Sequence, residues 1–547
     1  MAGVVAVAVL WLKYRYQIIL FYVHYRIAIA FVISCIVFAI FLKALDKIEK
    51  SRAPGDLEKH VLRKSKDEDS VYMGFTTDKG KPVYFKESMR RKHIQVTGTT
   101  DAGKSESVII PLSAHDMKSG RGLIIIDGKS DCSLIDKIYA YARLYDREHD
   151  VRILSICNPE ISQTFNPLAG GTPLEITERV FKAFTFENEY YKNLQYTALL
   201  QTLLIFEAAK IKPTPLKIVE ALSSKERLKH LATLGQVPKL IEWATEQFSL
   251  SRDEREKRTS GLITQLQVMT VGELAPIFNA EESDINMDEA FSSRHIIYCQ
   301  LPVGKIPTLG KSIGRLVLQC VQGAVASRHL DKNKSREFFS VSLDDFTEYL
   351  TEGFVTLLNK SRSANVGIVF AHQAIGDLAT LGEPIKNSIL TNANLKVFMK
   401  TNEPDSAEYF ANTIGTIQTA KVTERQKSSA FGQTKTGEGS VRDAEEYRFH
   451  PNLFKQELGA GDAIVTLPHH RGSLAVRMHF RMLPDLDPCK LPHIRKPAPL
   501  SLPPIPKDSD GPQAINGGAT PTVAEPAPDS MAGGIVDAAK NNNKEAA

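Results

Sequence analysis

The chain has 547 residues, of which 43% are hydrophobic, 24% are charged and 8% are aromatic. This composition is ordinary for folded domains and excludes a wholly disordered chain, a collagen-like repeat and a transporter with many membrane spans. The 68 basic and 63 acidic side chains leave a formal net charge of +5, which is too small by itself to indicate a nucleic-acid-binding protein.

An uncharged apolar run near the N-terminus predicts a membrane anchor. The run extends from Ile27 to Leu42, between Arg26 and Lys43. A bilayer crossing needs ~20 apolar residues, or ~17 at the short end, and the run reaches that length if Lys43 extends its charge outward. A buried core helix is the alternative, but apolar side chains occupy every helix face. Residues 1–12 are also apolar and indicate an interfacial segment or a degraded first span, since a signal peptide would begin with its positive region.

The residues after the anchor predict an α/β sheet interrupted by a helical insertion. The charge-rich segment Asp46–Asp69 is typical of a helical stem or linker, and Val71–Phe85 is typical of a hairpin. Helical periodicity without strand-like runs predicts an all-α insertion from about Leu174 to Met287. Strand–helix alternation on both sides of the insertion favours an α/β sheet. The predicted strands are 93–97, 122–126, 151–156, 295–301, 338–343, 367–370, 395–399 and 462–465.

Two polar stretches near the C-terminus predict irregular structure. Gln418–Ala444 is polar throughout and predicts a mobile loop. From about Pro497 the composition turns to Pro, Ala, Gly, Asn and Asp, which predicts a disordered tail. The predicted division of the chain is a membrane anchor at 1–45, a linker at 46–70, the first part of a nucleotide-binding domain at 71–173, an all-α domain at 174–290, its second part at 291–495 and a disordered tail at 496–547.

The most specific motif is a phosphate-binding loop between a predicted strand and a helix-capable segment. Its glycines allow backbone N–H groups to converge on phosphate oxygens. We expect Lys104 to neutralise charge on the β- and γ-phosphates of ATP, and the Ser105 hydroxyl to ligate Mg²⁺. An ordinary glycine-rich turn is the alternative, and Pro111 is expected to kink the following helix or end it early. The residues that fit G-x-x-x-x-G-K-[ST] are Gly98, Thr99, Thr100, Asp101, Ala102, Gly103, Lys104 and Ser105.

A phosphate-binding loop needs a carboxylate at the end of a neighbouring strand to hold the metal, and the sequence offers two candidates. The strand 338–343 is followed by Asp344 and Asp345, and the strand 122–126 is followed by Asp127. We favour the first pair, in which Asp344 positions Mg²⁺ and Asp345 polarises the attacking water. Capping of the next helix is the alternative role for these aspartates.

Polar residues around the strand 367–370 are candidates for detecting the nucleotide. Gln373 follows this strand and is the candidate γ-phosphate sensor, with His372 as a second choice; a hydrogen-bonded loop residue is the alternative. Arg362 precedes the strand and is a candidate arginine finger for the γ-phosphate of a neighbouring subunit. Ordinary surface charge is the alternative for this arginine, and from the residues alone it is the favoured one.

Two other kinds of site are not indicated by the sequence. The six cysteines are scattered without a CxxC pair or a zinc spacing, which predicts a reduced body without structural zinc. The mixed-sign run Ser251–Arg258 is typical of a solvated helix face rather than of a DNA contact. The residues by themselves therefore indicate an ATP site and no nucleic-acid site.

Taken together, these features resemble the type IV secretion coupling proteins, the TraG/TraD family of FtsK/HerA-type ATPases, over roughly residues 20–485. The motifs occur in the order of that family, and the more discriminating ones are Ile109-Ile110-Pro111-Leu112 and Asn166-Pro167-Leu168. The resemblance implies a RecA-like P-loop NTPase sheet with an inserted all-α domain, an N-terminal transmembrane anchor and a disordered C-terminal tail. It also implies that Arg362 acts in trans and that Gln373 acts as a sensor.

The same resemblance implies a location and partners. The protein would be a homo-hexamer in the bacterial inner membrane, with the bulk of the chain in the cytoplasm. Its ATPase activity would deliver DNA, single-stranded and with its relaxase, or secreted proteins to a type IV secretion channel. The all-α insertion would lie at the cytosolic end of the ring, where substrate is met.

Two departures from the family pattern leave other functions open. Asp345 stands where the family usually has a glutamate, and Glu348 is a possible substitute one turn later. The first membrane span also looks incomplete. A nucleotide-binding receptor or scaffold with little turnover is therefore one rival. A DNA pump for chromosome handling is another, which the Pro/Ala/Asn tail disfavours because it cannot fold as a winged helix.

Overall fold

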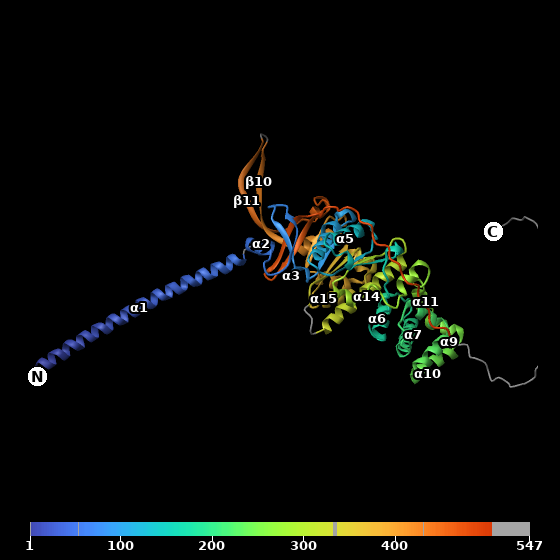
Figure 1. The fold of residues 1–547 in the computed structure, drawn as a ribbon. Helices are drawn as coiled ribbons and strands as arrows, with labels where there is room; N and C mark the ends of the chain where they lie inside the picture. The colour runs from blue at the N-terminus through green and yellow to red at the C-terminus, as the bar shows by residue number, and fades with distance from the viewer. Residues whose placement is uncertain (1, 53, 332–335, 430–431, 506–547) are drawn as a thin grey trace, which may run out of the picture. The chain divides into compact units, whose positions relative to one another are not determined.

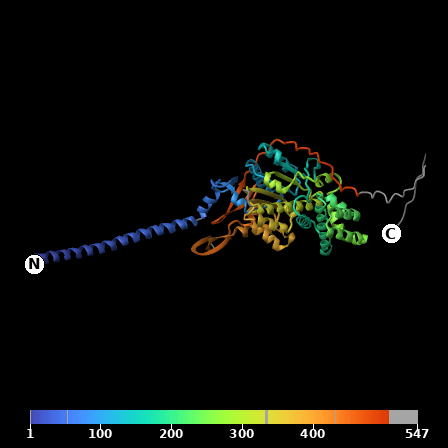
Figure 2. The same ribbon diagram turned by 60° about the horizontal axis from the view of Figure 1, so that its bottom comes forward.

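A computed structural model describes residues 2–52, 54–331, 336–429 and 432–505 of the chain. An eleven-stranded mixed sheet forms its centre, with helices on both faces (Figures 1 and 2). The strands are β1 (Ser70–Thr76), β2 (Pro82–Lys86), β3 (Ile94–Thr97), β4 (Leu123–Asp127), β5 (Val151–Ser155), β6 (Ile296–Gln300), β7 (Phe339–Asp344), β8 (Val366–His372), β9 (Leu395–Phe398), β12 (Asp462–His469) and β13 (Gly472–Phe480). A separate two-stranded sheet consists of β10 (Thr416–Ser429) and β11 (Gly432–Tyr447).

The strands of the large sheet lie in the order β2-β1-β13-β12-β9-β3-β8-β7-β4-β6-β5. From β9 to β5 neighbouring strands are parallel, and from β2 to β12 they are antiparallel, as is the junction of β12 with β9. Parallel strands are buried on both faces, and this is why their sequences are continuous apolar runs. In β4, for example, Leu123 and Ile125 pack in one hydrophobic cluster, while Ile124 and Ile126 pack in another on the opposite face.

Helices cover each face of this sheet. One face packs against α4 and α5, and the other packs against α14 to α17. The helices outside the insertion are α1 (Ala2–Arg52), α2 (Pro54–Leu62), α3 (Glu87–Arg90), α4 (Ile110–Lys118), α5 (Cys132–Leu144), α14 (Pro307–Leu330), α15 (Gly353–Ser361), α16 (Glu383–Asn392), α17 (Pro404–Ile414) and α18 (Pro451–Gln456).

The predicted all-α insertion is confirmed between β5 and β6, and its helices gather beside the sheet in both views (Figures 1 and 2). Its first helix begins at a capping box, in which Thr172 and Glu175 satisfy each other's backbone N–H groups. The insertion is built from α6 (Pro173–Ala183), α7 (Glu189–Ala208), α8 (Pro215–Ser223), α9 (Lys225–Gly235), α10 (Pro238–Ser249), α11 (Arg252–Gln267), α12 (Ala275–Phe278) and α13 (Met287–Ser293).

Three sequence-based expectations differ from the structure. The polar segment Gln418–Ala444, expected to be a mobile loop, pairs as the hairpin β10–β11 in its described part. The long strand β13 was not predicted, because its polar and apolar residues do not alternate cleanly. Pro111 does not end its helix early, because the backbone stays helical from Ser105 to Lys118. A wide π-helical turn at Ser105–Ile109 lies just before the proline, and such turns are among the usual places where a helix bends.

Helix α1 contains the residues predicted to form the membrane anchor. Among the described residues, the stretch Gly3–Arg26 is long enough and apolar enough to cross a membrane. Ile33–Lys43 is a shorter apolar segment. The predicted span Ile27–Leu42 lies in the same helix. Towards the other end of the chain, Leu502 is buried in the main hydrophobic cluster, whereas residues 506–547 of the predicted tail lie outside the described part. The predicted domain boundaries stay predictions.

Candidate nucleotide-binding site

The phosphate-binding loop runs from the end of β3 into a helix, as its motif requires. Gly103 has a φ of +83°, a conformation that glycine adopts without strain. At Gly98 a Cβ would lie 2.8 Å from the Cβ of Met399, so a side chain there would force β9 away. The amine of Lys104 is buried and donates hydrogen bonds to the carbonyls of Gly98 (2.8 Å) and Thr99 (3.1 Å). The loop is therefore folded around its own lysine.

Charged groups surround this lysine on several sides. Burial lowers the pKa of Lys104, while the carboxylates of Asp345, Asp344 and Asp377 act in the opposite direction. The positive charge of Lys129 lowers the pKa further. Lys129 follows Asp127 at the end of β4, so two cations and several carboxylates converge at the carboxyl ends of the parallel strands. An anion with several negative oxygens would interact favourably with both cations.

Asp344 is the carboxylate that reaches the phosphate-binding loop. It is the last residue of β7, is 2% exposed, and accepts a 2.5 Å hydrogen bond from the Ser105 hydroxyl. Burial raises the pKa of Asp344, and the bond from Ser105 opposes that rise. A hydroxyl and a carboxylate oxygen held together in this way are the ligand types that Mg²⁺ prefers. The residues present therefore fit this ion, although the role of each stays a prediction.

Asp127, the alternative metal-binding candidate, lies beside Asp344 in the sheet, but both of its carboxylate oxygens already accept hydrogen bonds. The two aspartates are register partners across β4 and β7. One carboxylate oxygen of Asp127 accepts the N–H groups of Lys129 (2.8 Å) and Ser130 (3.1 Å). The other accepts the N–H of Asp131 (3.0 Å) and the Tyr298 hydroxyl (2.8 Å). Burial, against these hydrogen bonds, raises the pKa of Asp127 to about 6.

Asp345 is the second residue of the predicted pair. It adopts a left-handed conformation with φ +45° and precedes the short 3₁₀ turn Phe346–Tyr349, but its side chain makes no capping hydrogen bond to that turn. The capping alternative is therefore not supported for Asp345. Glu348, its suggested substitute, is exposed and forms an ion pair with Lys311 at 3.1 Å.

The two residues after β8 have different surroundings. Gln373 is exposed and lies at the mouth of the loop, where its amide oxygen is 3.5 Å from the Thr100 hydroxyl. His372 is fully buried; its Nδ1 donates to the Ala374 carbonyl at 2.8 Å, and its Nε2 lies 3.0 Å from the Gln95 amide. Burial lowers the pKa of His372 to about 4. His372 is therefore a neutral core residue, and Gln373 stays the candidate sensor.

Arg362 does not lie at the phosphate-binding loop of its own chain. It is exposed and precedes the seven-residue strand β8, whose other end carries Gln373. A strand of that length spans about 23 Å. Arg362 and the loop are therefore at opposite edges of the sheet.

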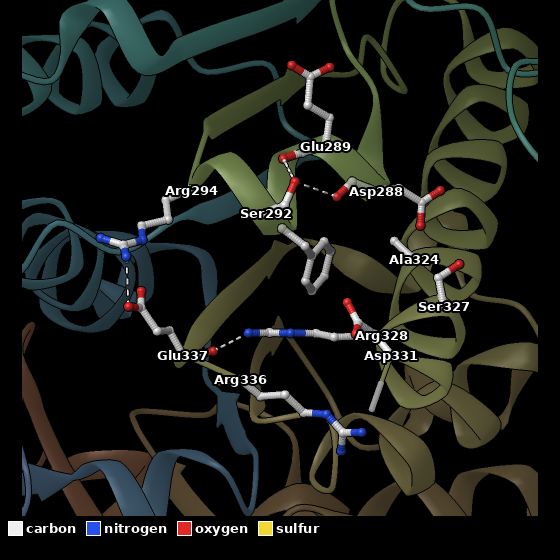
Figure 3. Close-up of a pocket in the computed structure, with 11 residues that line it drawn as sticks. Asp288, Glu289, Ser292, Arg294, Ala324, Ser327, Arg328, Asp331, Arg336 and Glu337 are labelled. Atoms are coloured by element: carbon white, nitrogen blue, oxygen red, sulfur yellow. Dashed lines mark hydrogen bonds and ion pairs between the residues drawn. The ribbon is translucent and has the colours of Figure 1, made fainter. Parts of the chain in front are cut away.

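A cavity of about 690 Å³ marks the edge of the sheet that carries Arg362 (Figure 3). Figure 3 shows Arg328 reaching from α14 towards Glu337, which also pairs with Arg294 at 2.7 Å. Arg336, another lining residue, donates a 3.1 Å hydrogen bond to the carbonyl of Ser363, the neighbour of Arg362. This cavity is separate from the candidate nucleotide site.

A second cavity, of about 520 Å³, opens beside the phosphate-binding loop. Thr99, Thr100 and Gln373 line one part of it, and Lys400 and Glu403, which follow β9, line another. Sequence reasoning missed these last two residues. The available signal was their position just after a predicted strand, but nothing in the sequence says that β9 lies next to β3. No group of three or more His, Cys, Asp or Glu suited to a metal occurs among the residues that the structure describes.

Two family models match the chain on either side of the helical insertion. The model described as type IV secretory system conjugative DNA transfer matches residues 42–172, which include the phosphate-binding loop. The model described as the TraM recognition site of TraD and TraG matches residues 339–451, which include Asp344, Arg362 and Gln373.

Comparison with individual proteins also finds similarity to coupling proteins. The type 4 coupling protein DotL of Legionella pneumophila is 21% identical over 444 residues, which are 69% of this chain and 56% of DotL. The chain thus spans little more than half the length of this curated relative. The unbound bacterial conjugative coupling protein TrwBdeltaN70 has a TM-score of 0.56 at 13% identity, covering 78% of this chain and 92% of its own. The plasmid coupling protein TrwB in complex with ADP and Mg²⁺ has the same score at 14% identity, covering 79% and 93%. At these identities the likeness shows a common fold.

Proposed function

We propose that the chain is a type IV secretion coupling protein, a membrane-anchored ATPase that delivers substrates to a secretion channel. The observation that carries the proposal is the meeting of Ser105 with Asp344 beside a phosphate-binding loop. In P-loop NTPases a serine or threonine of the loop and a strand-end aspartate hold Mg²⁺ on the β- and γ-phosphates of the nucleotide. The structure of TrwB in complex with ADP and Mg²⁺ supports the binding of a magnesium nucleotide here.

Each residue of the site has a proposed task. Lys104 gives up its carbonyl partners in the loop and neutralises the terminal phosphates. Ser105 and Asp344 hold Mg²⁺, which neutralises charge that develops on the phosphate oxygens. Asp345 orients a water molecule and accepts its proton as the water oxygen bonds to the γ-phosphorus, while the bond from that phosphorus to the β–γ bridging oxygen breaks to release phosphate and ADP. Gln373 contacts the γ-phosphate at the mouth of the loop.

Arg362 is proposed to complete the site of a neighbouring subunit in a hexamer. Its distance from its own loop and its exposure support an action in trans, because an exposed arginine at a subunit edge can reach a phosphate across an interface. The proposed assembly is anchored in the inner membrane through α1, with the rest of the chain in the cytoplasm. DNA with its relaxase, or secreted proteins, are the proposed cargo.

Replacement of Lys104 by Ala tests the enzymatic part of the proposal. The full chain, purified in detergent, is expected to release phosphate from ATP, and Lys104→Ala is expected to abolish turnover without changing the oligomeric state. Lys239→Ala, a substitution of an exposed lysine on α10, is the matched control. Full turnover by Lys104→Ala in an oligomer of normal size would contradict the assignment.

A receptor or scaffold with slow turnover is the rival that one observation favours. Asp345 has a shorter side chain than the family's usual glutamate, and Glu348 is engaged with Lys311 instead of facing the loop. Nucleotide would then stabilise assembly rather than power transport. Hydrolysis measured with and without DNA separates the two, since a motor accelerates on its cargo and a scaffold does not.

A further inference from the structure

A groove of about 860 Å³ lies between the helical insertion and the first turns of α14. Its floor is the segment between α6 and α7. The Thr185 carbonyl in that segment accepts a 3.1 Å hydrogen bond from Gln265 of α11, and its hydroxyl accepts a 3.0 Å bond from Arg315 of α14. Figure 1 shows these helices close together beside the sheet. The groove is therefore formed by contacts between the insertion and the nucleotide-binding part of the chain.

Five charged side chains line this groove, and four of them are basic. They include Lys192, Lys257, Lys311 and Arg315, whereas Glu187 is the acidic residue of the lining. Burial lowers the pKa of Arg315, and its Nε has no hydrogen-bond partner within the described part of the chain. A cationic groove with low-dielectric walls attracts an anionic ligand.

Two further features indicate a ligand rather than a solvated surface. The 24-residue helix α14 begins at the groove, and no side chain caps its N-terminus, so its first N–H groups can bind an anion. Gln195 is only 5% exposed and also lines the groove, yet its amide oxygen has no hydrogen-bond partner among the described residues. Buried amides are normally paired. An incoming N–H group would satisfy this oxygen.

We propose that this groove binds a single-stranded nucleic acid, which deepens the proposed function and rests on it. Phosphates would lie against Lys257, Lys311 and the start of α14, and a base would donate an N–H to Gln195. Tyr191, which lines the groove and is 38% exposed, offers a face for stacking a base. Basic grooves that also carry aromatic side chains and an amide are typical of single-strand binding.

The groove is also connected to the nucleotide site. Lys311, on the groove wall, pairs with Glu348 at 3.1 Å, and the N–H of Glu348 donates to the Asp345 carbonyl at 3.3 Å. Both charged side chains of the ion pair are more than 40% exposed, and exposed pairs exchange partners easily. A nucleic-acid phosphate that pairs with Lys311 would break the ion pair between Lys311 and Glu348. The Glu348 carboxylate would then be unpaired next to the turn that follows Asp345. Binding of the strand would thereby alter the site where water is oriented.

Binding is measured with the full chain in detergent and a fluorescent oligothymidylate, by anisotropy at several salt concentrations. Each phosphate contact to a single strand contributes ~0.7 to the slope of log affinity against log salt. Lys257→Ala and Lys311→Ala should each reduce that slope by ~0.7 and weaken binding roughly fivefold at 0.1 M salt. Lys239→Ala, on α10 outside the groove, should bind as the unmodified chain does. Lys104→Ala should also bind the oligonucleotide normally.

ATP turnover measured at increasing oligonucleotide concentrations then separates a loss of oligonucleotide affinity from a loss of stimulation. Lys257→Ala should raise the oligonucleotide concentration needed for half-maximal stimulation roughly fivefold and keep the maximal rate. Lys311→Ala should lose the stimulation even when the oligonucleotide is saturating, because it lacks the partner of Glu348. Equal stimulation of Lys311→Ala and the unmodified chain at saturation would overturn the coupling.

The outcomes separate this proposal from the proposed function. Unchanged oligonucleotide affinity and salt slope in both groove variants would overturn the groove, even if Lys104→Ala abolishes turnover. Turnover retained by Lys104→Ala would overturn the ATPase assignment and leave the binding result to stand on its own. Binding of labelled polyglutamate with the same lysine dependence, without binding of oligothymidylate, would assign the groove to acidic proteins and overturn the nucleic-acid proposal.

Discussion

The Ser105 hydroxyl donates a 2.5 Å hydrogen bond to the Asp344 carboxylate, although 239 positions separate the two residues in the chain. They meet because β3 and β7 lie on either side of β8 and all three run parallel, so their carboxyl ends share one edge of the sheet. This single contact joins the phosphate-binding loop to a strand-end aspartate. It brings together the two oxygen groups that we propose as ligands of a magnesium nucleotide.

Replacing Asp344 by Asn should remove catalysis without harming the fold. We expect ATP turnover to fall by roughly 100-fold or more, since loss of a metal-binding charge costs several kcal/mol of transition-state stabilisation. Burial raises the pKa of Asp344, so its negative charge is unfavourable in the folded protein, and the thermal midpoint should stay equal or rise. Phosphate release over a magnesium titration measures the first effect and a thermal melt the second. A variant with normal magnesium dependence would contradict the role.

The neighbouring Asp127→Asn substitution should reduce the stability of the fold and leave the magnesium dependence of turnover unchanged. The NH₂ group of the amide would face the Asp131 N–H, donor against donor, where a carboxylate oxygen now accepts, while the Tyr298 hydroxyl could turn to accept from the amide. Such a mismatch costs about 1–3 kcal/mol of folding free energy. We expect a magnesium dependence close to that of the unmodified chain and a lower thermal midpoint, by less than the mismatch alone would give, because the burial that raises the pKa of Asp127 to about 6 makes its charge unfavourable in the folded protein. An equally large loss of magnesium affinity in both variants would show that the two aspartates share the metal.

Arg362→Ala should disable hydrolysis only in the assembled state. Arginine fingers contribute about 10³–10⁵ to the rate in related reactions, and this exposed side chain is not part of the core. We therefore expect a rate loss of roughly 1,000-fold with an unchanged thermal midpoint. Mixing Arg362→Ala with Lys104→Ala subunits should restore part of the activity, because some interfaces then combine an intact arginine with an intact loop. If mixing restores nothing, an action across the interface is contradicted.

His93 should make the protein sensitive to mild acid. The Ile368 N–H donates to its Nδ1 at 3.2 Å and its Nε2 donates to the Leu358 carbonyl at 2.9 Å, an arrangement that requires a neutral ring. Burial lowers the pKa of His93 to about 4, below the unfolded value of 6.5. Its stabilising contribution is therefore complete above pH 6.5 and is lost as the pH falls towards 4.

The loss should amount to about 2 kcal/mol between pH 7 and pH 5. Thermal midpoints of the detergent-solubilised chain across this range measure it. His93→Gln should be less stable at pH 7 and should show a flatter dependence on pH, since glutamine does not titrate. Parallel pH profiles for the two proteins would mean that His93 is not the group responsible.

Local sequence determined the parts of this protein that depend on neighbouring residues in the chain. The loop Gly98–Ser105 was recognisable because its glycines, lysine and serine must follow one another to surround a phosphate. The strands β3 to β9 were recognisable because burial on both faces demands continuous apolar runs. The helical periodicity between β5 and β6 likewise predicted the insertion.

Only the tertiary structure decided which of these parts meet. Asp127 and Asp344 end equivalent strands in the sequence, and strand order alone made Asp344 the partner of Ser105 and left Asp127 to hold its own loop. The hairpin β10–β11 was missed because its polar residues carry no burial pattern, and backbone pairing does not require one. The basic groove draws residues from α7, α11 and α14, which are remote in the chain. Such arrangements follow from long-range packing, which no local pattern encodes.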